Sequence, residues 1–558
     1  MIRKKWVSDN SNIEKIKELT EKLNIDESIV RILVNRGIDN LKDIEEFLNP
    51  SLDNLYDPFL LNDMDKAVER INTAVKNKEK IYIYGDYDVD GVTASSIVYI
   101  SLKEIYDNVY IYIPERENEG YGLNTKAIDK IYKDNGNLII TVDCGISAHS
   151  EAEYAKSLGI DMIITDHHTC PEVLPSCVAV INPKRNDSTY PFSELCGAGV
   201  ALKLCSALNL LSEKIIAICA VGTVADIVPL ILENRIITYY GIKLLREGIL
   251  ENINILCSIA GIDVKNITST TIGFTIAPRI NAAGRMATAK EAVEFFISKD
   301  IKRIKELAEY LDNLNLKRQE CEKEIYKDAK EKIEKNKEYE NNIMVVSGEG
   351  WQEGVIGIVA SKITEEYYKP CIMVSINEKE GKGSSRSVKG YNIYEGLFGV
   401  SELLIKFGGH SLAAGLSINP KNIDILREKI NENAKEIFES GDISPYIKID
   451  AELKAKNINL KYAEDLKKLE PFGMGNPQPL FIIKDALIKE SYSFSLKKHM
   501  RLNLVKEGVS LEAVGFNMGS FANSLKPGQK IFLLCSVDIN EFRGNKKIQA
   551  KIKDIRLT

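Results

Sequence analysis

Residues 80–105 read KIYIYGDYDVDGVTASSIVYISLKEI, which is an apolar run, a tight acidic loop and then a helix pattern. Three further apolar runs follow, separated by helical stretches: NVYIYIPER at 108–116, NLIITVDCGIS at 137–147 and DMIITDHHT at 161–169. This alternation predicts an α/β fold with a parallel sheet and helices on both faces. Because functional loops lie at the carboxyl ends of such strands, the polar motifs that end these runs are candidate site residues.

The loop that follows the first strand, GDYDVDG at 85–91, carries Asp86, Asp88 and Asp90. Like charges this close raise one another's pKa and cost energy unless a cation balances them. A divalent metal ion is the simplest counter-charge. The alternative is an acidic surface turn, but the apolar run and the helix pattern on either side indicate a loop held at a strand end.

Further acids and histidines follow the later strands. Asp143 comes after the third strand, and Asp166, His167 and His168 come after the fourth, in a chain with only five histidines. Asp226 stands in the otherwise apolar VGTVADIVPL, where burial is costly unless the carboxylate binds a metal or orients a histidine. Carboxylates suit Mg²⁺ and Mn²⁺, imidazoles shift the preference toward Mn²⁺, Co²⁺ or Zn²⁺, and the number of acids favours two ions. A pair of core or surface histidines is the alternative for 167–168.

Composition narrows the class of protein. The chain has 558 residues, and its 74 Lys+Arg against 80 Asp+Glu give a formal net charge of −6. This excludes a histone-like, charge-driven nucleic-acid binder but allows a local basic groove. The ten cysteines include no C-x-x-C pair, so neither a four-cysteine zinc site nor an iron–sulfur cluster is predicted, and the size of the chain argues against a disulfide framework. We expect a reduced, cytosolic protein.

One stretch, IIAICAVGTVADIVPLIL at 215–232, is long enough to cross a bilayer. Gly222, Asp226 and Pro229 interrupt it, and an aspartate at the midplane is expensive in lipid. We therefore predict a buried core segment that presents Asp226.

The length of the chain predicts three or four domains. Residues 1–75 look helical and amphipathic, which indicates packing and support. The charged segment 301–339, with leucines at helical spacing, predicts one or two long helices that connect domains; a solvated helix with no other role is the alternative. A second α/β segment follows, in which we expect KGSSRS at 382–387 to be a turn and 391–407 to be a helix. From about residue 443, short apolar runs separated by Gly, Asn and Lys turns predict a small β-barrel.

The motifs GDYDVDG, VDCG, DHH and VADIVPL, in this order, resemble the DHH phosphoesterase superfamily. FGGHSLAAGLSI at 407–418 resembles the DHH-associated domain, and the connector and β-rich end resemble the single-stranded-DNA-specific exonucleases of the superfamily. The resemblance covers nearly the whole chain and implies two α/β lobes joined by a long helix, plus a C-terminal OB-like β-barrel. The implied regions are an N-terminal helical lead at 1–75, a DHH catalytic domain at 76–300, a connector helix at 301–340, a DHH-associated domain at 341–440 and an OB-like nucleic-acid-binding domain at 441–558.

The same resemblance assigns roles to individual residues. The implied metal ligands are Asp88, Asp90, Asp143, His167, His168 and Asp226. The implied catalytic residues are His410, His168 and Asp86, of which His410 would reach the scissile phosphate and Asp86 would be an outer ligand. The implied phosphate- or DNA-binding residues are Arg116, Arg279, Gln352, Ser384, Arg386, Gly408 and Gly409.

Chemistry supports these assignments independently. Arginine forks hold phosphate oxygens at two points, adjacent glycines allow close backbone approach, and Gln352 opens a helix pattern whose N–H groups favour anions. Structural salt bridges are the alternative for the three arginines. In the barrel, Tyr492, Phe494 and Phe542 are candidates for stacking bases, while solvated loop charges are the alternative for the basic residues there. Those basic residues are Lys497, Lys498, Arg501, Arg543, Lys546 and Lys547.

The expected function is hydrolysis of single-stranded DNA from the 5′ end to 5′-mononucleotides, with two Mn²⁺ or Mg²⁺ ions, in DNA repair and recombination. The closest alternative is a DHH-family phosphodiesterase that acts on cyclic dinucleotides or short RNA. An inorganic pyrophosphatase and a catalytically silent nucleic-acid scaffold are further alternatives. The expected partners are single-stranded DNA, a helicase and a single-strand-binding protein, and we expect a cytoplasmic monomer that does not bind membranes.

Overall fold

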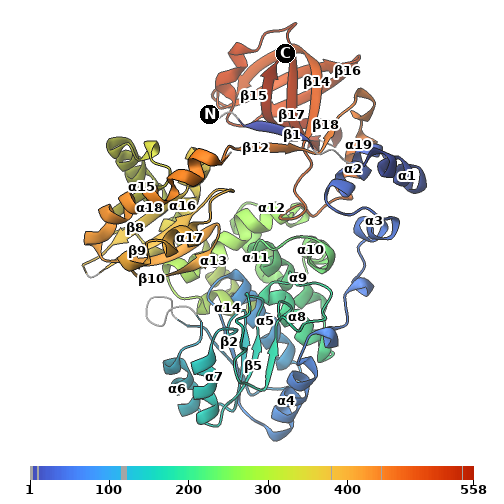
Figure 1. Ribbon diagram of the computed structural model, residues 1–558. Coiled ribbons are helices and arrows are strands. Elements are labelled where there is room, and N and C mark those ends of the chain that lie inside the picture. Colours follow the sequence, from blue (N-terminus) through green and yellow to red (C-terminus); the bar gives the residue numbers. More distant parts are fainter. Residues whose placement is uncertain (1–3, 9–11, 115–121, 379, 442, 543) are drawn as a thin grey trace. The chain divides into compact units, whose positions relative to one another are not determined.

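The computed structural model describes residues 4–8, 12–114, 122–378, 380–441, 443–542 and 544–558 (Figure 1). The chain divides into two compact units, each described by itself below. The smaller unit comprises Met1–Lys5, Asn281–Thr288 and Glu309–Ile447. The larger unit comprises Trp6–Ile280, Ala289–Ala308 and Lys448–Thr558.

The larger unit contains the predicted parallel sheet, with five strands in the order β3-β2-β4-β5-β6 (Figure 1). Every residue of β2 and β4 is buried, as expected for a parallel sheet covered on both faces. The sequence analysis missed β6, which has three residues and lies at the sheet edge. The bounds are β2 Ile81–Gly85, β3 Val109–Tyr112, β4 Leu138–Val142, β5 Asp161–Thr165 and β6 Ala179–Ile181.

Helices cover both faces of this sheet, which confirms the predicted fold class. Helices α6 and α7 share one core with β2, β4 and β5, whereas α5 and α8 pack on the sheet together with α9. Helix α5 is buried around most of its circumference, which explains why its sequence is apolar and small-residue-rich with no polar face. The bounds are α5 Val89–Lys103, α6 Thr125–Lys133, α7 His149–Ser157, α8 Gly197–Ala207 and α9 Glu213–Ala225.

The apolar run 215–232 forms buried α9, a loop that begins with Asp226, and the start of α10 (Leu232–Arg246). The prediction of a core segment is therefore confirmed. Over the described residues, no helix is both long and apolar enough to span a bilayer. All ten cysteines are free thiols, as the sequence predicted.

The first three helices of the N-terminal lead and the C-terminal barrel share one hydrophobic core, whereas α4 packs against α8 and β6. Ile32 and Ile44 of the lead are buried with Leu453, Leu469 and Phe481, so the lead does not have a core of its own. The lead also contains a short strand, β1, that the sequence analysis did not predict. Its elements are β1 Lys5–Ser8, α1 Ile13–Leu23, α2 Glu27–Asn35, α3 Leu41–Leu48 and α4 Met64–Asn77.

The predicted C-terminal barrel is present and closed. Its sheet runs β13-β14-β15-β16-β18-β17, and the additional pairing of β14 with β17 closes five of these strands into a barrel. Helix α19 (Leu460–Lys467) precedes β14. The strands are β13 Ala451–Glu452, β14 Phe481–Phe494, β15 His499–Lys506, β16 Val509–Gly515, β17 Lys530–Phe542 and β18 Asn545–Leu557.

The smaller unit has a five-stranded sheet in the order β10-β11-β9-β8-β7. Here two sequence predictions were wrong: KGSSRS forms most of strand β9 instead of a turn, and 391–407 is a short helix, α17, followed by strand β10. Strand β9 pairs on both sides, with β8 and β11, so tertiary pairing overrides its weak β-propensity. The bounds are β7 Met344–Glu349, α16 Glu353–Tyr367, β8 Cys371–Ile376, β9 Gly381–Arg386, α17 Ile393–Phe398, β10 Leu404–His410, β11 Ala413–Ile418 and α18 Ile423–Ser440.

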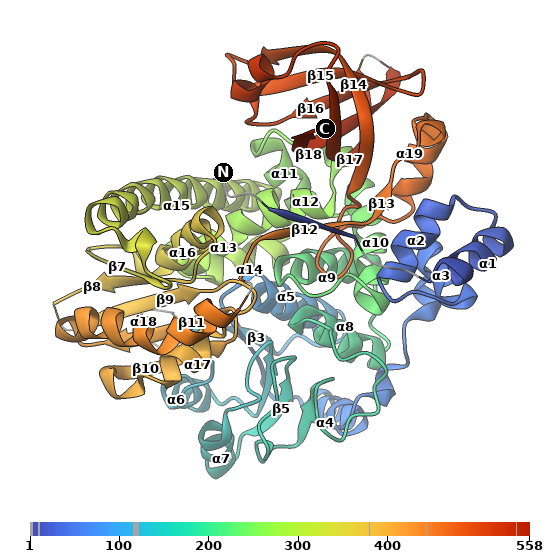
Figure 2. The same cartoon turned by 45° about the horizontal axis from the view of Figure 1, so that its top comes forward.

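The charged segment after residue 300 forms one continuous helix, α15 (Ile301–Asn336), as Figure 2 shows side-on. Its apolar positions, among them Leu307, Leu311, Ile325 and Ile333, are buried, while most of its charged residues face solvent. Amphipathic packing therefore stabilises this helix.

Candidate metal centre

The three aspartates of GDYDVDG lie where β2 passes into α5. Asp86 follows β2, Asp88 caps α5 by accepting a hydrogen bond from the Gly91 amide at 3.0 Å, and Asp90 lies in the first turn of α5. A Cβ at position 91 would lie 2.6 Å from the Asp86 carbonyl oxygen, so only glycine permits this tight passage. Glycine thus keeps the acids of the loop close together.

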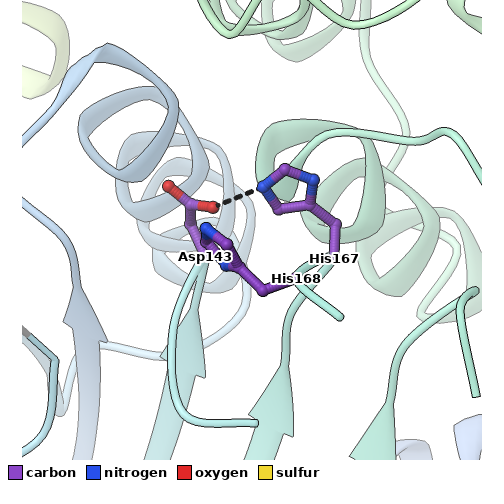
Figure 3. A group of neighbouring side chains, drawn as sticks. All are labelled: Asp143, His167 and His168. Carbon is purple, nitrogen blue, oxygen red and sulfur yellow. Dashed lines mark ion pairs between the residues drawn. The ribbon is translucent and has the colours of Figure 1, made fainter. Parts of the chain in front are cut away.

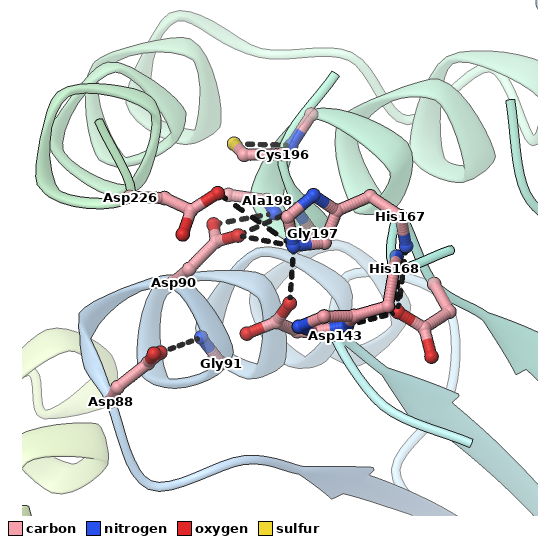
Figure 4. A network of polar contacts seen from close by, with 12 residues as sticks. Asp88, Asp90, Gly91, Asp143, His167, His168, Cys196, Gly197, Ala198 and Asp226 are labelled. Atoms are coloured by element: carbon pink, nitrogen blue, oxygen red, sulfur yellow. Dashed lines mark hydrogen bonds and ion pairs between the residues drawn. The ribbon is translucent and has the colours of Figure 1, made fainter. Parts of the chain in front are cut away.

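Residues from three other elements meet these acids. Asp143 follows β4, His167 follows β5, and Asp226 follows α9 (Figure 4). The His167 Nε2 atom lies 3.1 Å from Asp143 Oδ1, 3.7 Å from Asp226 Oδ2 and 3.8 Å from Asp90 Oδ2. Figure 3 shows the contact between Asp143 and His167, with His168 next to both. The side chains that follow the strands converge because adjacent parallel strands end on the same side of the sheet, the side of their carboxyl ends.

Three overlapping groups of side chains have ligand atoms that all lie within 4.8 Å of one another. Together they contain every residue that the sequence analysis proposed for metal binding, and also Asp86. The roles of these residues as ligands stay a prediction. The groups are Asp143 with His167 and His168, Asp90 with His167 and Asp226, and Asp86 with Asp88 and Asp143.

The electrostatics of this cluster favour the binding of a cation. Burial and the neighbouring carboxylates raise the pKa of Asp143 well above its usual value. Burial raises the pKa of Asp90, and burial with the charges of Asp90 and Asp88 raises the pKa of Asp226 to about 8. Among the described residues, buried Asp143 Oδ1 and His167 Nδ1 have no hydrogen-bond partner. A mixed carboxylate and imidazole set of this kind fits Mn²⁺ or Mg²⁺.

These pKa shifts predict how the stability of the metal-free protein depends on pH. Between the ordinary aspartate pKa of about 4 and the raised pKa of Asp226, which is about 8, the folded state binds more protons than the unfolded state. The free energy of unfolding should therefore fall as the pH rises through this window. Thermal melts in a chelator at pH 5.5 and pH 8 test this, and saturating Mn²⁺ should reverse the loss at pH 8. A metal-free protein that is more stable at pH 8 would contradict the shifts.

Asp166 is a positioning residue that the sequence analysis named only as part of its motif. Its side chain is 1% exposed and accepts a hydrogen bond from His168 Nδ1 at 2.7 Å, and others from the backbone amides of Ile146 and His167. Burial raises the pKa of Asp166, but the hydrogen bond and charge of His168 outweigh this effect and the pKa is lowered. Asp166 thus fixes the tautomer and orientation of His168. An acid directly before two histidines was the available signal.

The N-terminus of α8 holds Asp90 in place, which the sequence analysis missed. The amides of Gly197 and Ala198 donate to the two carboxylate oxygens of Asp90 at 2.6 and 2.8 Å. A Cβ at position 197 would lie 2.5 Å from the Asp143 Cβ, so glycine is required for this approach. The GAG tripeptide at 197–199 was the only sequence signal.

In the smaller unit, the predicted phosphate-binding residues gather on one face of the sheet. Across the neighbouring strands β10, β11 and β9, the residues His410, Ala413 and Arg386 lie opposite one another and form one row. Two residues along each strand, and so on the same face, a second row consists of Gly408, Gly415 and Ser384. Arg386 Nη1 lies 3.1 Å from Ser384 Oγ. Gln352 is the N-cap residue of α16, which packs on β8 and on β9, the strand of Ser384 and Arg386. Gly409, between the two rows, has a φ of +151°.

The remaining candidates are dispersed. Arg279 belongs to α13 (Ala277–Met286), and its Nη1 donates to the Thr275 carbonyl at 2.8 Å. On the barrel, the Arg501 guanidinium lies 5.2 Å from the centre of the Phe494 ring, next to exposed Tyr492. Arg116 and Arg543 lie outside the described residues, as does the side chain of Phe542.

Three stretches of the chain match family models. Residues 80–223 match the DHH family N-terminal domain, residues 340–436 the DHHA1 domain and residues 449–554 the RecJ OB domain. The three matches fall on the parallel sheet of the larger unit, the mixed sheet of the smaller unit and the closed barrel.

Curated relatives are similar along the whole chain. The single-stranded-DNA-specific exonuclease RecJ of Bacillus subtilis (strain 168) is 38% identical over 554 residues, which are 99% of this chain and 70% of that protein. RecJ of Escherichia coli (strain K12) is 31% identical over 552 residues, covering 94% of this chain and 95% of that protein. The crystal structure of RecJ in complex with Mn²⁺ from Thermus thermophilus matches with a TM-score of 0.85 at 25% identity, covering 99% of this chain and 80% of that one. A crystal structure of exonuclease RecJ bound to manganese matches with a TM-score of 0.61 at 28% identity. This match covers 70% of this chain and 99% of that one.

Proposed function

The chain belongs to the RecJ family of single-stranded-DNA-specific exonucleases, and from this premise we propose that it removes nucleotides from the 5′ end of single-stranded DNA. It is a hydrolase of the DHH superfamily with Mn²⁺ or Mg²⁺ as cofactor. The observation that carries the proposal is the convergence of five acids and two histidines, from distant parts of the chain, at the carboxyl ends of the parallel strands.

We propose that two ions are held by the carboxylates and imidazoles of the cluster. Bound ions of this kind supply an activated hydroxide and neutralise charge on the phosphate. The residues themselves have separate tasks: Asp166 orients His168, and the α8 N-terminus fixes Asp90. The proposed ligands are Asp88, Asp90, Asp143, His167, His168 and Asp226, with Asp86 as an outer ligand.

The smaller unit carries the proposed phosphate grip. Arg386 and Ser384 would hold the 5′-terminal phosphate, and His410 would stabilise charge on the scissile phosphate. Their shared face supports this proposal, because the strand register places His410, Ser384 and Arg386 on one side of the sheet and Arg386 donates to Ser384 Oγ. Holding the 5′ phosphate at a fixed place would set the polarity of hydrolysis.

Polarity is tested with single-stranded DNA labelled at the 5′ or the 3′ end, incubated with the protein and Mn²⁺. Release of labelled mononucleotide at the earliest times from the 5′-labelled strand alone is the expected result. Duplex DNA and a cyclic dinucleotide are the controls. Faster opening of the cyclic dinucleotide would favour a phosphodiesterase, which the comparisons with curated relatives do not favour.

Arg386→Lys should reduce the preference for a 5′-phosphorylated strand over a 5′-hydroxyl strand, because a lysine cannot hold two phosphate oxygens at once. We expect about a tenfold rise in KM for the phosphorylated strand and little change in kcat, since one charge-assisted pair contributes roughly 1.5 kcal/mol. Steady-state kinetics on the two strands measure this. Arg427→Lys, at the Glu338 ion pair of the same unit, is the control. If kcat/KM fell equally on the 5′-phosphorylated and the 5′-hydroxyl strand, Arg386 would not bind the 5′ phosphate.

We further propose that the protein acts as a cytoplasmic monomer in DNA repair and recombination, where a helicase and a single-strand-binding protein supply its substrate. A nuclease that needs a free single strand depends on enzymes that open and hold it. Light scattering during size-exclusion chromatography tests the oligomeric state. Stimulation of duplex degradation by an added helicase tests the partnership, and its absence would count against it.

A further inference from the structure

Phe274 is exposed to an extent that packing does not explain. It lies in a π-helical turn, η4 (Ile272–Ile276), and its side chain is 83% exposed, whereas Ile272 and Ile276 are buried. A phenylalanine in solvent forgoes the stabilisation that its burial would give. Single π-helical turns are rare and occur frequently at functional sites.

The turn that carries Phe274 packs against the end of α9, the helix that presents Asp226. A Cβ on Gly273 would lie 3.7 Å from Val224 Cγ1, and η4 packs against α9. Val224 precedes Asp226 by two residues, or about 3 Å along a helix. Asp226 is one of the clustered acids, at the end of α9 in Figure 4. The turn that carries Phe274 therefore lies close to the helix end that presents Asp226.

Ile227, the residue after Asp226, is a second and independent anomaly. Its φ is +60°, a left-handed conformation that is a genuine outlier for a β-branched residue, and its side chain is 66% exposed. Helices that end in this conformation usually place glycine there. The chain thus keeps a strained backbone with an isoleucine side chain that is mostly in solvent. Strain of this kind persists at functional sites.

We propose that Phe274 and Ile227 form an apolar shelf at the edge of the metal cluster, on which an unpaired base of the DNA strand stacks. This rests on the proposed function. The occupant follows from the proposed substrate: a single strand held at the metal cluster lies next to this surface, and the uncharged base is the part of the strand that suits an apolar surface. Stacking on an aromatic ring tolerates any base. A paired base is already stacked within its duplex, so the shelf selects single strands.

Binding of fluorescein-labelled single-stranded DNA, measured by anisotropy in Ca²⁺ to slow hydrolysis, tests the shelf. Phe274→Ala should raise Kd about tenfold, the scale of one lost base–aromatic contact, and Phe274→Trp should retain binding. Phe59→Ala, at another exposed phenylalanine of the larger unit, is the control and should change nothing. Equal Kd values for the wild type and Phe274→Ala would overturn the proposal.

A base-deletion series locates the contact. Oligonucleotides with one abasic site at successive positions should bind the wild type weakly at one position only, and Phe274→Ala should be insensitive to that site. Uniform sensitivity along the strand, or the same profile in both proteins, would refute stacking on Phe274. If the wild type hydrolyses no DNA under any condition, the proposed function fails instead, and the two failures are thereby distinguished.

Ile227→Gly provides a readout that a purely structural role would not give. Glycine relieves the strain at φ +60°, so the melting temperature should stay level or rise although a large side chain is lost. Binding of single-stranded DNA should nevertheless weaken. A lower melting temperature would mean that Ile227 packs instead of binding, and unchanged Kd would remove it from the shelf.

Discussion

Asp143→Asn is expected to lower the rate of DNA hydrolysis by about 1000-fold or more, because it removes a carboxylate shared by two of the three ligand groups. The same substitution should raise the melting temperature of the metal-free protein. Burial and four neighbouring aspartates disfavour the charged form of Asp143, so a neutral amide of the same shape relieves repulsion. Activity and metal-free stability should therefore move in opposite directions.

Nuclease assays in Mn²⁺ and thermal melts in chelator, with and without added Mn²⁺, measure both effects. The stabilisation by Mn²⁺ that the wild type shows should be largely lost in the variant, because stabilisation follows metal affinity. Asp161→Asn is the matched control: it lies at the opposite end of the same sheet, in an exposed ion pair with Arg70. Wild-type activity of Asp143→Asn would refute the metal assignment. A lower metal-free melting temperature would refute the electrostatic account.

Arg235→Met is expected to destabilise the larger unit by roughly 3–5 kcal/mol, the scale for leaving several buried polar groups unpaired. Arg235 is buried in the first turn of α10, and within the described parts of the chain no carboxylate forms an ion pair with it. It donates to the carbonyls of Phe47 at 3.0 Å and of Leu469 and Lys468 at 2.9 Å, and it stacks on the Phe47 ring. One side chain thus satisfies the C-terminal ends of α3 and α19, whose carbonyls helices leave unpaired.

Urea denaturation measures this loss. Arg235→Lys should recover only part of it, because an ammonium group cannot reach three carbonyls in a plane. Arg303→Met, at an exposed ion pair with Glu294, is the control and should have little effect. A change at Arg235 no larger than that of the control would show that neighbouring groups or water replace its hydrogen bonds.

Much of the metal centre could be predicted from the sequence. Acids at the ends of apolar runs are local signals, and parallel strands bring their carboxyl ends to one edge whatever the remainder of the fold does. Asp88, Asp143 and His167 were therefore identifiable before their distances were known. The residues that hold the centre in place were not, since the amides of Gly197 and Ala198 carry no side-chain signal.

The second sheet was harder to predict. KGSSRS has the composition of a turn, and residues 391–407 have helical spacing, yet the structure places β9 and β10 there. Strand β9 exists because β8 and β11 pair with it on both sides, and β10 because it extends the same sheet. Residue types differ in their intrinsic preference for helix or strand by roughly tenths of a kcal/mol per residue. Strand pairing and burial stabilise a segment by more than that, so they decide its conformation.

The sequence by itself determined the fold class, the closed barrel and the acids and histidines of the metal cluster, because each depends on periodicity or on residues at strand ends. Only the tertiary structure decided that the N-terminal helices and the barrel share a core, that Arg235 joins two helix ends and that Ile227 is strained beside Asp226. These features depend on contacts between residues up to hundreds of positions apart. No local pattern encodes such contacts, since the free energy that selects them comes from burial and pairing in the complete fold.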